Sequence, residues 1–265
     1  MRKKVSALLR TFVLVAFVPT LTLSLVACEP EDNEPGTEMV ETEGKGDDAT
    51  GSDRPESDAE GEGSTPGADA GDEGGSPEKP VHEAVDLGLS VKWASCNVGA
   101  SSPEEYGDYF AWGETTTKSS YTESNSVTYD LSISELESRG IIDANGNLTA
   151  AYDAATANWG SEWRMPTLDE IKELRNNCTW EWTTQNGVKG RKVTGPNGNS
   201  IFLPAAGYRR DTSLGHAGSY GYYWSATPCS DNSYGAFNFG FYSGLYVWHY
   251  DFRSKGFTVR PVTEK

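Results

Sequence analysis

The chain has few cationic residues for its size. Among 265 residues, 22 Lys and Arg stand against 39 Asp and Glu, and the net charge is −17. Phosphate backbones attract the opposite sign, so this balance argues against a nucleic-acid partner. The three histidines, His82, His216 and His249, form no zinc-binding helix motif, and no phosphate loop or dinucleotide-binding glycine pattern occurs. The sequence therefore predicts neither a metal centre nor a cofactor.

Residues 29–80 contain no aromatic side chain, but they hold ten Gly, six Pro and 18 acids. Such a segment cannot bury enough apolar surface to offset its chain entropy, which predicts a disordered acidic linker. Of the 30 aromatic residues, 28 lie after it. One folded domain is therefore expected over 81–265.

Residues 1–28 have the pattern of a secretory signal: a cationic start, and then an apolar stretch over 11–26 that is short for a membrane span. The stretch ends on Leu25-Val26-Ala27-Cys28, which resembles a bacterial lipobox and predicts lipidation of Cys28. An ordinary signal peptide with an incidental cysteine is the alternative. The acids that follow Cys28 resemble the export signal of Bacteroidetes outer-surface lipoproteins, or they merely begin the linker.

Turn dipeptides and aromatic residues from residue 81 onward are typical of a β-rich domain with long loops. Two capping boxes, Ser132 with Glu135 and Thr167 with Glu170, predict helices over 132–139 and after Pro166. The acids of the second helix, Asp169, Glu170 and Glu173, are interpreted as a solvated face. The other expected elements are a helix over 150–159, strands over 91–98, 179–185, 188–194, 200–205, 222–227, 236–242, 245–252 and 257–262, and a type I′ turn at Asn186-Gly187.

Several ordered motifs of this domain resemble a known family. They are Asp86-Leu-Gly-Leu-Ser-Val-Lys-Trp-Ala-Ser-Cys-Asn-Val-Gly99, Tyr106-Gly-Asp-Tyr-Phe-Ala-Trp-Gly-Glu114, Trp163-Arg-Met-Pro-Thr167, Tyr223-Trp-Ser-Ala-Thr-Pro228 and Phe257-Thr-Val-Arg-Pro-Val262. Over residues 82–262 the chain resembles the Fibrobacter succinogenes major paralogous domain, which is common among Bacteroidetes lipoproteins. The resemblance implies an α+β, C-type-lectin-like fold with two or three short helices, several antiparallel β-hairpins, and N- and C-terminal strands that pair.

Enzyme signatures are missing. The sequence Ala217-Gly-Ser-Tyr-Gly221 lacks the first glycine of a nucleophile elbow. The related formylglycine-generating enzymes use a reactive cysteine pair near the C-terminal end, where Cys229 stands alone. The calcium-dependent sugar motifs of C-type lectins are also absent, so that mode of binding is not carried over. A protein without catalytic activity is expected, and a formylglycine-generating-type enzyme is the rival interpretation.

The C-terminal third carries a dense aromatic segment, which suits a recognition surface. Strand alternation assigns Phe237, Phe239 and Phe241 to the core, whereas for Tyr246, Trp248, Tyr250 and Phe252 it leaves core and surface both open. Residues 221–254 also contain no Lys, Glu, Gln or Met. That composition resembles the variable region of retroelement-diversified proteins, and chance composition in a loop-rich paralogue is the alternative.

Three cysteines follow Cys28. In an exported domain thiols tend to pair, and three leave one over. The family-like contexts of Cys96 and Cys178 favour a disulfide between these two, with buried free thiols as the alternative.

We therefore expect an outer-membrane lipoprotein that faces the cell exterior and displays a binding domain on an acidic stalk. Its partner would be a protein or glycan on a host, phage or neighbouring cell. A structural envelope protein without a diffusible ligand is a further alternative. The expected ligand-binding residues are Cys229, Asp231, Tyr234, Tyr242, Tyr246, His249, Tyr250, Asp251 and Phe252.

Overall fold

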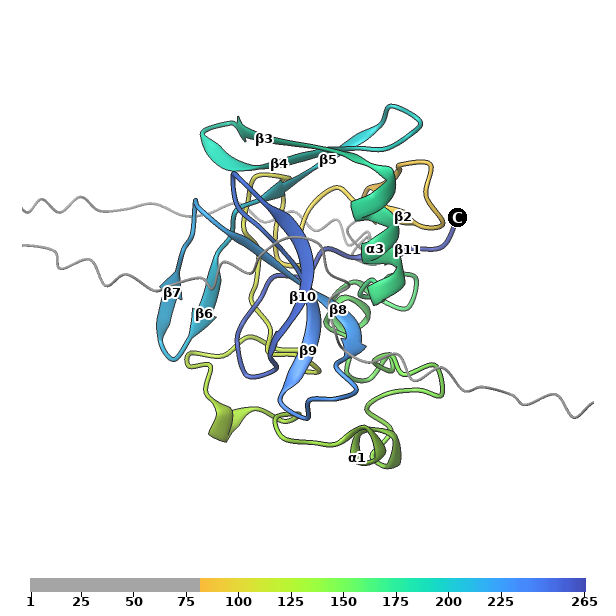
Figure 1. Ribbon diagram of the computed structural model, residues 1–265, viewed down its shortest axis with the longest axis vertical. Helices are drawn as coiled ribbons and strands as arrows, with labels where there is room; N and C mark the ends of the chain where they lie inside the picture. Colours follow the sequence, from red (N-terminus) through yellow and green to blue (C-terminus); the bar gives the residue numbers. More distant parts are fainter. Residues whose placement is uncertain (1–81) are drawn as a thin grey trace, which may run out of the picture.

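The computed structural model describes residues 82–265, an α+β domain with few helices and several small antiparallel sheets (Figure 1). The expected leader, Cys28 and the acidic linker lie outside these residues. The helices are η1 (Glu123–Asn125, a 3-10 turn), α1 (Ile133–Ser138), α2 (Ala154–Trp159) and α3 (Leu168–Asn177). The strands are β1 (Ala84–Asp86), β2 (Lys92–Ala94), β3 (Thr179–Gln185), β4 (Val188–Thr194), β5 (Ser200–Pro204), β6 (Tyr208–Arg210), β7 (Ser213–Gly215), β8 (Gly221–Pro228), β9 (Gly235–Phe241), β10 (Tyr246–Phe252) and β11 (Val262–Thr263). Within the described part, no helix is long and apolar enough to cross a membrane.

Local sequence signals place the helices well. Both predicted capping boxes form, at the start of α1 and at the start of α3. The helix expected over 150–159 begins only at Ala154, because the Asp153 carboxylate accepts a hydrogen bond from the Thr156 amide at 2.9 Å and so sets the N-cap.

The β3–β4 hairpin has the predicted boundaries. Its turn residues Asn186 and Gly187 have φ values of 48° and 84°, as a type I′ turn requires. The strand expected over 91–98 is only β2, and the short strands β1, β6 and β7 were not anticipated.

The prediction of one continuous strand over 257–262 is wrong. Phe257 bridges to Phe110 and Thr258 to Tyr223, and only Val262 enters a sheet, where β11 pairs with β2. The segment changes partners because it threads through the interior with both faces buried. Arg260, 1% exposed, donates to the carbonyl oxygens of Ala94, Ser95 and Phe202 at 2.7–3.0 Å. The expected pairing of terminal strands is present in the sheet β1-β2-β11.

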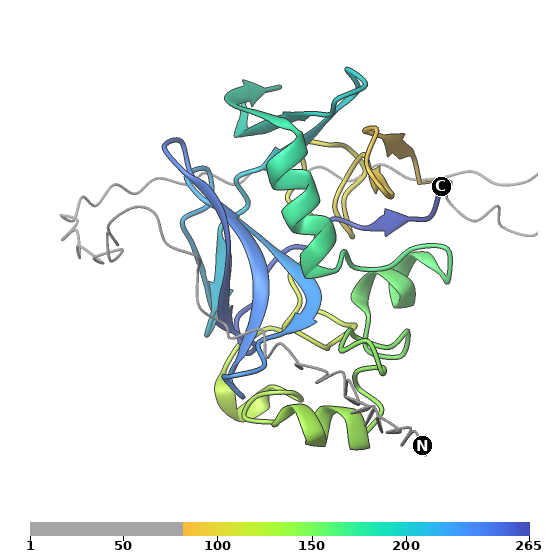
Figure 2. The ribbon, with the colours of Figure 1, turned by 45° about the vertical axis from the view of Figure 1, so that its right-hand side comes forward.

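The sheet β10-β9-β8 separates two core clusters. Trp224 points to one side, where it stacks on Phe257 with ring centroids 4.2 Å apart. Phe239 and Phe241 point to the other side, which α3 covers (Figure 2). Phe237, Phe239 and Phe241 are all buried, as strand alternation predicts.

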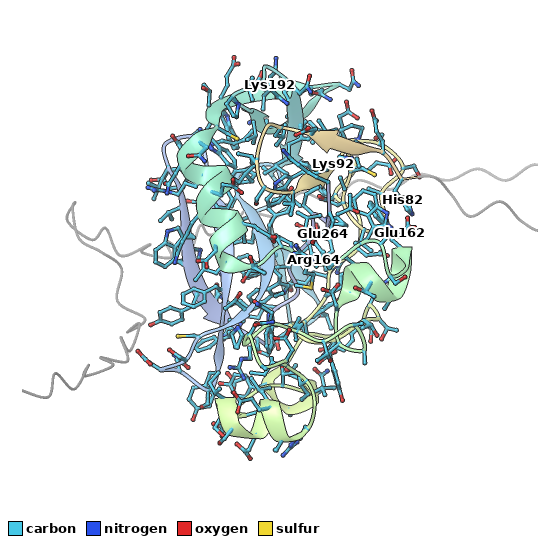
Figure 3. The ribbon with its side chains drawn as sticks, turned by 90° about the vertical axis from the view of Figure 1, so that its right-hand side faces the viewer. His82, Lys92, Glu162, Arg164, Lys192 and Glu264 are labelled. Carbon is cyan, nitrogen blue, oxygen red and sulfur yellow. The ribbon has the colours of Figure 1, made fainter. Side chains whose placement is uncertain are left out.

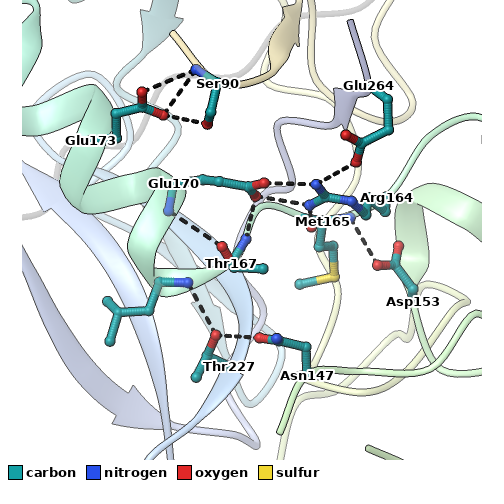
Figure 4. A network of polar contacts seen from close by, with 11 residues as sticks. Ser90, Asn147, Asp153, Arg164, Met165, Thr167, Glu170, Glu173, Thr227 and Glu264 are labelled. Carbon is teal, nitrogen blue, oxygen red and sulfur yellow. Dashed lines mark hydrogen bonds and ion pairs between the residues drawn. The ribbon is translucent and has the colours of Figure 1, made fainter. Parts of the chain in front are cut away.

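A polar network fixes α3 in place (Figure 4). Arg164 pairs with Glu170 at 2.6 Å and with Glu264 at 2.8 Å, and Figure 3 shows Arg164 beside Glu264 near the C-terminus. Glu173 accepts a hydrogen bond from the Ser90 amide at 3.0 Å. The predicted solvated face therefore holds only for Asp169, because Glu170 and Glu173 anchor the helix.

The predicted disulfide between Cys96 and Cys178 is not present: both are free thiols. Cys96 belongs to the core cluster that contains Trp224, whereas Cys178, at the end of α3, packs against the cluster that contains Phe239. Burial raises the pKa of both thiols, that of Cys178 to about 11.

Candidate ligand-binding surface

Four aromatic side chains lie at one end of β10. Tyr250 and Phe252 come from β10, Tyr234 from the loop before β9, and Tyr129 from the loop before α1. The Tyr129 ring lies 4.9 Å from that of Tyr234 and 6.3 Å from that of Phe252. Tyr234, Tyr250 and Phe252 are 39, 45 and 43% exposed. We call these four residues the aromatic patch.

A buried arginine holds the two loops of the patch together. Arg253 is fully buried, and its guanidinium lies over the Trp112 ring, 5.0 Å from the centroid. It donates to the carbonyl oxygens of Gly235 (2.8 Å), Thr128 (3.1 Å) and Leu131 (2.9 Å). These bonds tie the segment that carries Tyr129 to the start of β9. Burial lowers the pKa of Arg253 to about 10, so the side chain remains charged at neutral pH.

The rim of the patch is acidic beside Tyr129, whereas the Lys255 ammonium lies 5.9 Å from the centroid of the Phe252 ring. Asp130 accepts a hydrogen bond from the Ser233 hydroxyl at 2.9 Å and so links the two loops again. Burial, with a contribution from Glu123, raises the pKa of the Tyr129 phenol, which therefore stays neutral at physiological pH. The patch can offer flat rings and phenol hydroxyls for contact, beside carboxylates that accept hydrogen bonds.

Cys229 does not belong to this surface. The side chain is 1% exposed, so the prediction that it contacts a ligand is wrong. It lies behind the patch, where the Cys229 amide donates to the Gly235 carbonyl at 3.1 Å. Asp231, two residues on, is exposed.

His249 and Asp251 lie on the opposite face of β10 from Tyr250 and Phe252, because side chains alternate along a strand. The predicted site therefore does not combine them. Asp251 pairs with Lys255 at 3.0 Å. Burial lowers the pKa of His249, and Asp251 opposes that shift.

Tyr246 and Tyr242 lie at the other end of the hairpin. The Tyr246 ring stacks on Trp180 at 5.1 Å, and the Arg191 guanidinium lies 4.8 Å from its centroid. Tyr242 packs beside Tyr220 at 5.3 Å. The nine predicted residues thus fall into separate groups, of which only Tyr234, Tyr250 and Phe252 share the patch.

Sequence reasoning missed Tyr129 and Arg253. Tyr129 lies more than 100 residues before its partners, in a loop with no periodic pattern, so no sequence signal links it to them. Arg253 follows a strand, and arginine is usually a surface residue, but the fold buries this side chain completely.

Among residues 82–265, no three His, Cys, Asp or Glu side chains gather into a group that could hold a metal ion. A family model described as a domain of unknown function (DUF8237) matches residues 169–262, from α3 to the start of β11. The matched segment contains Tyr234, Tyr250, Phe252 and Arg253, but not Tyr129. Neither curated proteins nor solved structures give a match.

Proposed function

We propose that the domain is a non-catalytic recognition module that binds glycans through the aromatic patch. The observation that carries the proposal is that Tyr234, Tyr250 and Phe252 are all exposed at one end of β10, and that two of these rings contact Tyr129, in a domain whose other aromatic clusters are largely closed. Clustered exposed aromatic side chains supply contact area at low entropy cost. The proposed scaffold is C-type-lectin-like, in line with the motifs that resemble the Fibrobacter succinogenes paralogous domain.

The size of the patch favours a compact ligand. At about two-fifths exposure, three rings that could each bury ~150–250 Å² offer roughly 250 Å² of surface. A standard protein–protein interface buries roughly 800 Å² on each partner. One or two sugar rings fit the smaller area, because their apolar faces stack on aromatic rings while their hydroxyls reach polar groups at the rim.

The charge on the Tyr129 side of the patch favours a neutral glycan. Glu123 and Asp130 both lie close to Tyr129. These carboxylates can accept hydrogen bonds from sugar hydroxyls, and they repel an anionic ligand.

A glycan array with the full chain in detergent tests this proposal. Wild-type protein should bind one or more neutral glycans, and the double variant Tyr250→Ala/Phe252→Ala should lose that binding. Leu245→Ala is the matched control, because Leu245 is 47% exposed on the turn at the far end of the same hairpin. Absence of binding to every neutral glycan would contradict the proposal, as would equal losses in the double variant and the control.

The proposed location is the outer face of the outer membrane, with the domain held on the acidic stalk by lipid on Cys28. The support is the lipobox-like Leu25-Val26-Ala27-Cys28 after the apolar stretch. Mass spectrometry of the mature protein should find Cys28 as an acylated first residue, and protease added to intact cells should release the domain. An unmodified Cys28, or cleavage elsewhere, would show the lipidation proposal to be wrong.

A further inference from the structure

A polar pocket of about 380 Å³ lies outside the aromatic patch. Its walls are residues 107–109, residues 117–119 with Tyr121, and Arg209 on β6. The volume lies within the range of small-ligand sites, roughly 300–1,000 Å³, and towards its lower end. A ligand of one or two sugar residues is of suitable size.

The pocket presents a cation, Arg209, that has no anionic partner among residues 82–265. The Arg209 guanidinium lies over the Tyr109 ring, 5.1 Å from its centroid, and forms no hydrogen bond or ion pair with any other described residue. The neighbouring cation, Lys118, is already engaged: its ammonium pairs with Glu114 at 2.9 Å and donates to Asn125. Arg209 is therefore the charge available to a ligand.

Hydrogen-bonding groups line the same pocket. The exposed Asp108 carboxylate and the hydroxyls of Thr117 and Ser119 have no partner within the part of the chain that the structure describes. The phenols of Tyr109 and Tyr121 are not available in this way, because each donates to a backbone carbonyl. Burial raises the pKa of both phenols, so they contribute neutral rings as walls.

We propose that this pocket binds a hexuronic acid residue, with its carboxylate on Arg209 and its ring hydroxyls on Asp108, Thr117 and Ser119. The guanidinium fork matches a carboxylate in bidentate geometry, and its position over Tyr109 restrains it before the ligand arrives. The Asp108 carboxylate can accept hydrogen bonds from hydroxyl groups of the sugar. The pocket shares no residue with the aromatic patch, so the two sites are independent.

Calorimetric titration of the full chain in detergent with D-glucuronate tests the pocket, with D-glucose as the probe that lacks the carboxylate. We expect a Kd of about 1 mM for glucuronate and binding at least about tenfold weaker for glucose. Arg209→Gln should weaken glucuronate binding about tenfold or more. Arg210→Gln is the matched control, because Arg210 is the next residue of β6, is exposed and lies outside the pocket.

Arg209→Lys separates geometry from charge. It keeps the positive charge but not the fork, and it should bind glucuronate more weakly than wild type. Wild-type affinity in this variant, equal losses in Arg209→Gln and Arg210→Gln, or equal binding of glucose and glucuronate would each overturn the proposal.

A second pair of variants keeps the test valid if Arg209→Gln fails to fold. Thr117 and Thr116 are both exposed, but only Thr117 lines the pocket. Thr117→Glu should abolish glucuronate binding by charge repulsion, whereas Thr116→Glu should not. Equal affinities in these two variants would contradict the pocket. Tyr250→Ala/Phe252→Ala should leave glucuronate binding intact, so a failure of the patch and a failure of the pocket are distinguishable.

Discussion

One face of strand β10 is covered along one half of the strand and exposed along the other. Tyr246, Trp248, Tyr250 and Phe252 alternate along β10 and point to the same side of the sheet. Tyr246 and Trp248 are half-buried and pack against the core cluster under α3. Tyr250 and Phe252 are exposed, although they have the same kind of side chain on the same face.

The path of α3 explains this difference. At its start, the Leu168 amide donates to the Thr227 hydroxyl at the end of β8, at 3.0 Å. At its end, Arg175 reaches the Tyr246 carbonyl at the start of β10, at 3.5 Å. The helix therefore crosses the sheet diagonally (Figure 2). Tyr250 and Phe252, towards the other end of β10 from Tyr246, remain exposed. Alternation along a strand determines which face a residue occupies, whereas the neighbouring helix determines whether that face is covered.

The largest expected effect on stability comes from removing Arg253, which supports the exposed half of β10 that carries Tyr250 and Phe252. Arg253→Ala should destabilise the domain by about 3–5 kcal/mol, because two buried carbonyl oxygens and one partly buried carbonyl oxygen lose their donor and a cavity forms beside Trp112. Urea denaturation of the variant gives the free energy of unfolding. Arg210→Ala, at an exposed position, is the control and should change stability little. A loss below about 1 kcal/mol for Arg253→Ala would mean that Arg253 does not hold the two loops together.

Substitutions in the covered half of β10, at Tyr246 and Trp248, should have the next largest effect on stability. Trp248→Ala should cost about 2–3 kcal/mol, less than a fully buried Trp, because the ring contacts Phe237 at 5.9 Å and lies under the Lys172 ammonium at 5.2 Å. Tyr246→Ala should cost a similar amount through its lost stacking on Trp180. Thermal and urea unfolding measure both variants. If either has wild-type stability, the covered and open halves do not differ as proposed.

Some of this comparison could be predicted from the sequence. Side-chain alternation correctly placed Phe237, Phe239 and Phe241 in the core, and the capping box correctly placed the start of α3. The direction in which α3 crosses the sheet depends on Thr227 and Ser90, which lie far from the helix in sequence. No local pattern encodes such contacts, so the sequence could not decide which side chains of β10 are buried and which are exposed.

For the same reason, the sequence could not predict which residues form the patch, or that Cys96 and Cys178 do not pair. Tyr129 joins Tyr234 through a loop that Arg253 and Asp130 hold, and these contacts span more than 100 residues. Cys96 and Cys178 occur in family-like contexts, yet they pack in different core clusters. Sequence context indicates that a residue belongs to the fold, but it does not indicate its neighbour in space.

His249, on the opposite face of β10, should make the free energy of unfolding depend on pH. Burial lowers the pKa of His249 from its usual 6.5; Asp251 raises it and Lys255 lowers it further. Below a pH of about 6.5 the unfolded chain therefore binds a proton that the folded chain does not, so the free energy of unfolding falls as pH falls. The fall from this group ends once pH passes below the folded-state pKa.

His249→Gln should reduce this pH dependence between about pH 7 and pH 5, measured as the shift of the urea midpoint. His216→Gln is the control, because His216 is exposed on a turn. Equal slopes in wild type and His249→Gln would show that His249 does not carry the effect.

The smallest expected effect on stability is also the most direct test of the open half. Tyr250→Ala and Phe252→Ala each remove a ring that remains about two-fifths exposed and has no helix above it, so each should cost about 1 kcal/mol or less. Tyr250→Ala should be the milder of the two, since Phe252 also contacts Tyr129 and lies 5.9 Å from the Lys255 ammonium. Differential scanning calorimetry should therefore place both variants above Tyr246→Ala and Trp248→Ala in melting temperature. If Tyr250→Ala instead melts as low as Trp248→Ala, the ring is part of the core, and loss of glycan binding in the double variant would then report unfolding rather than a lost contact.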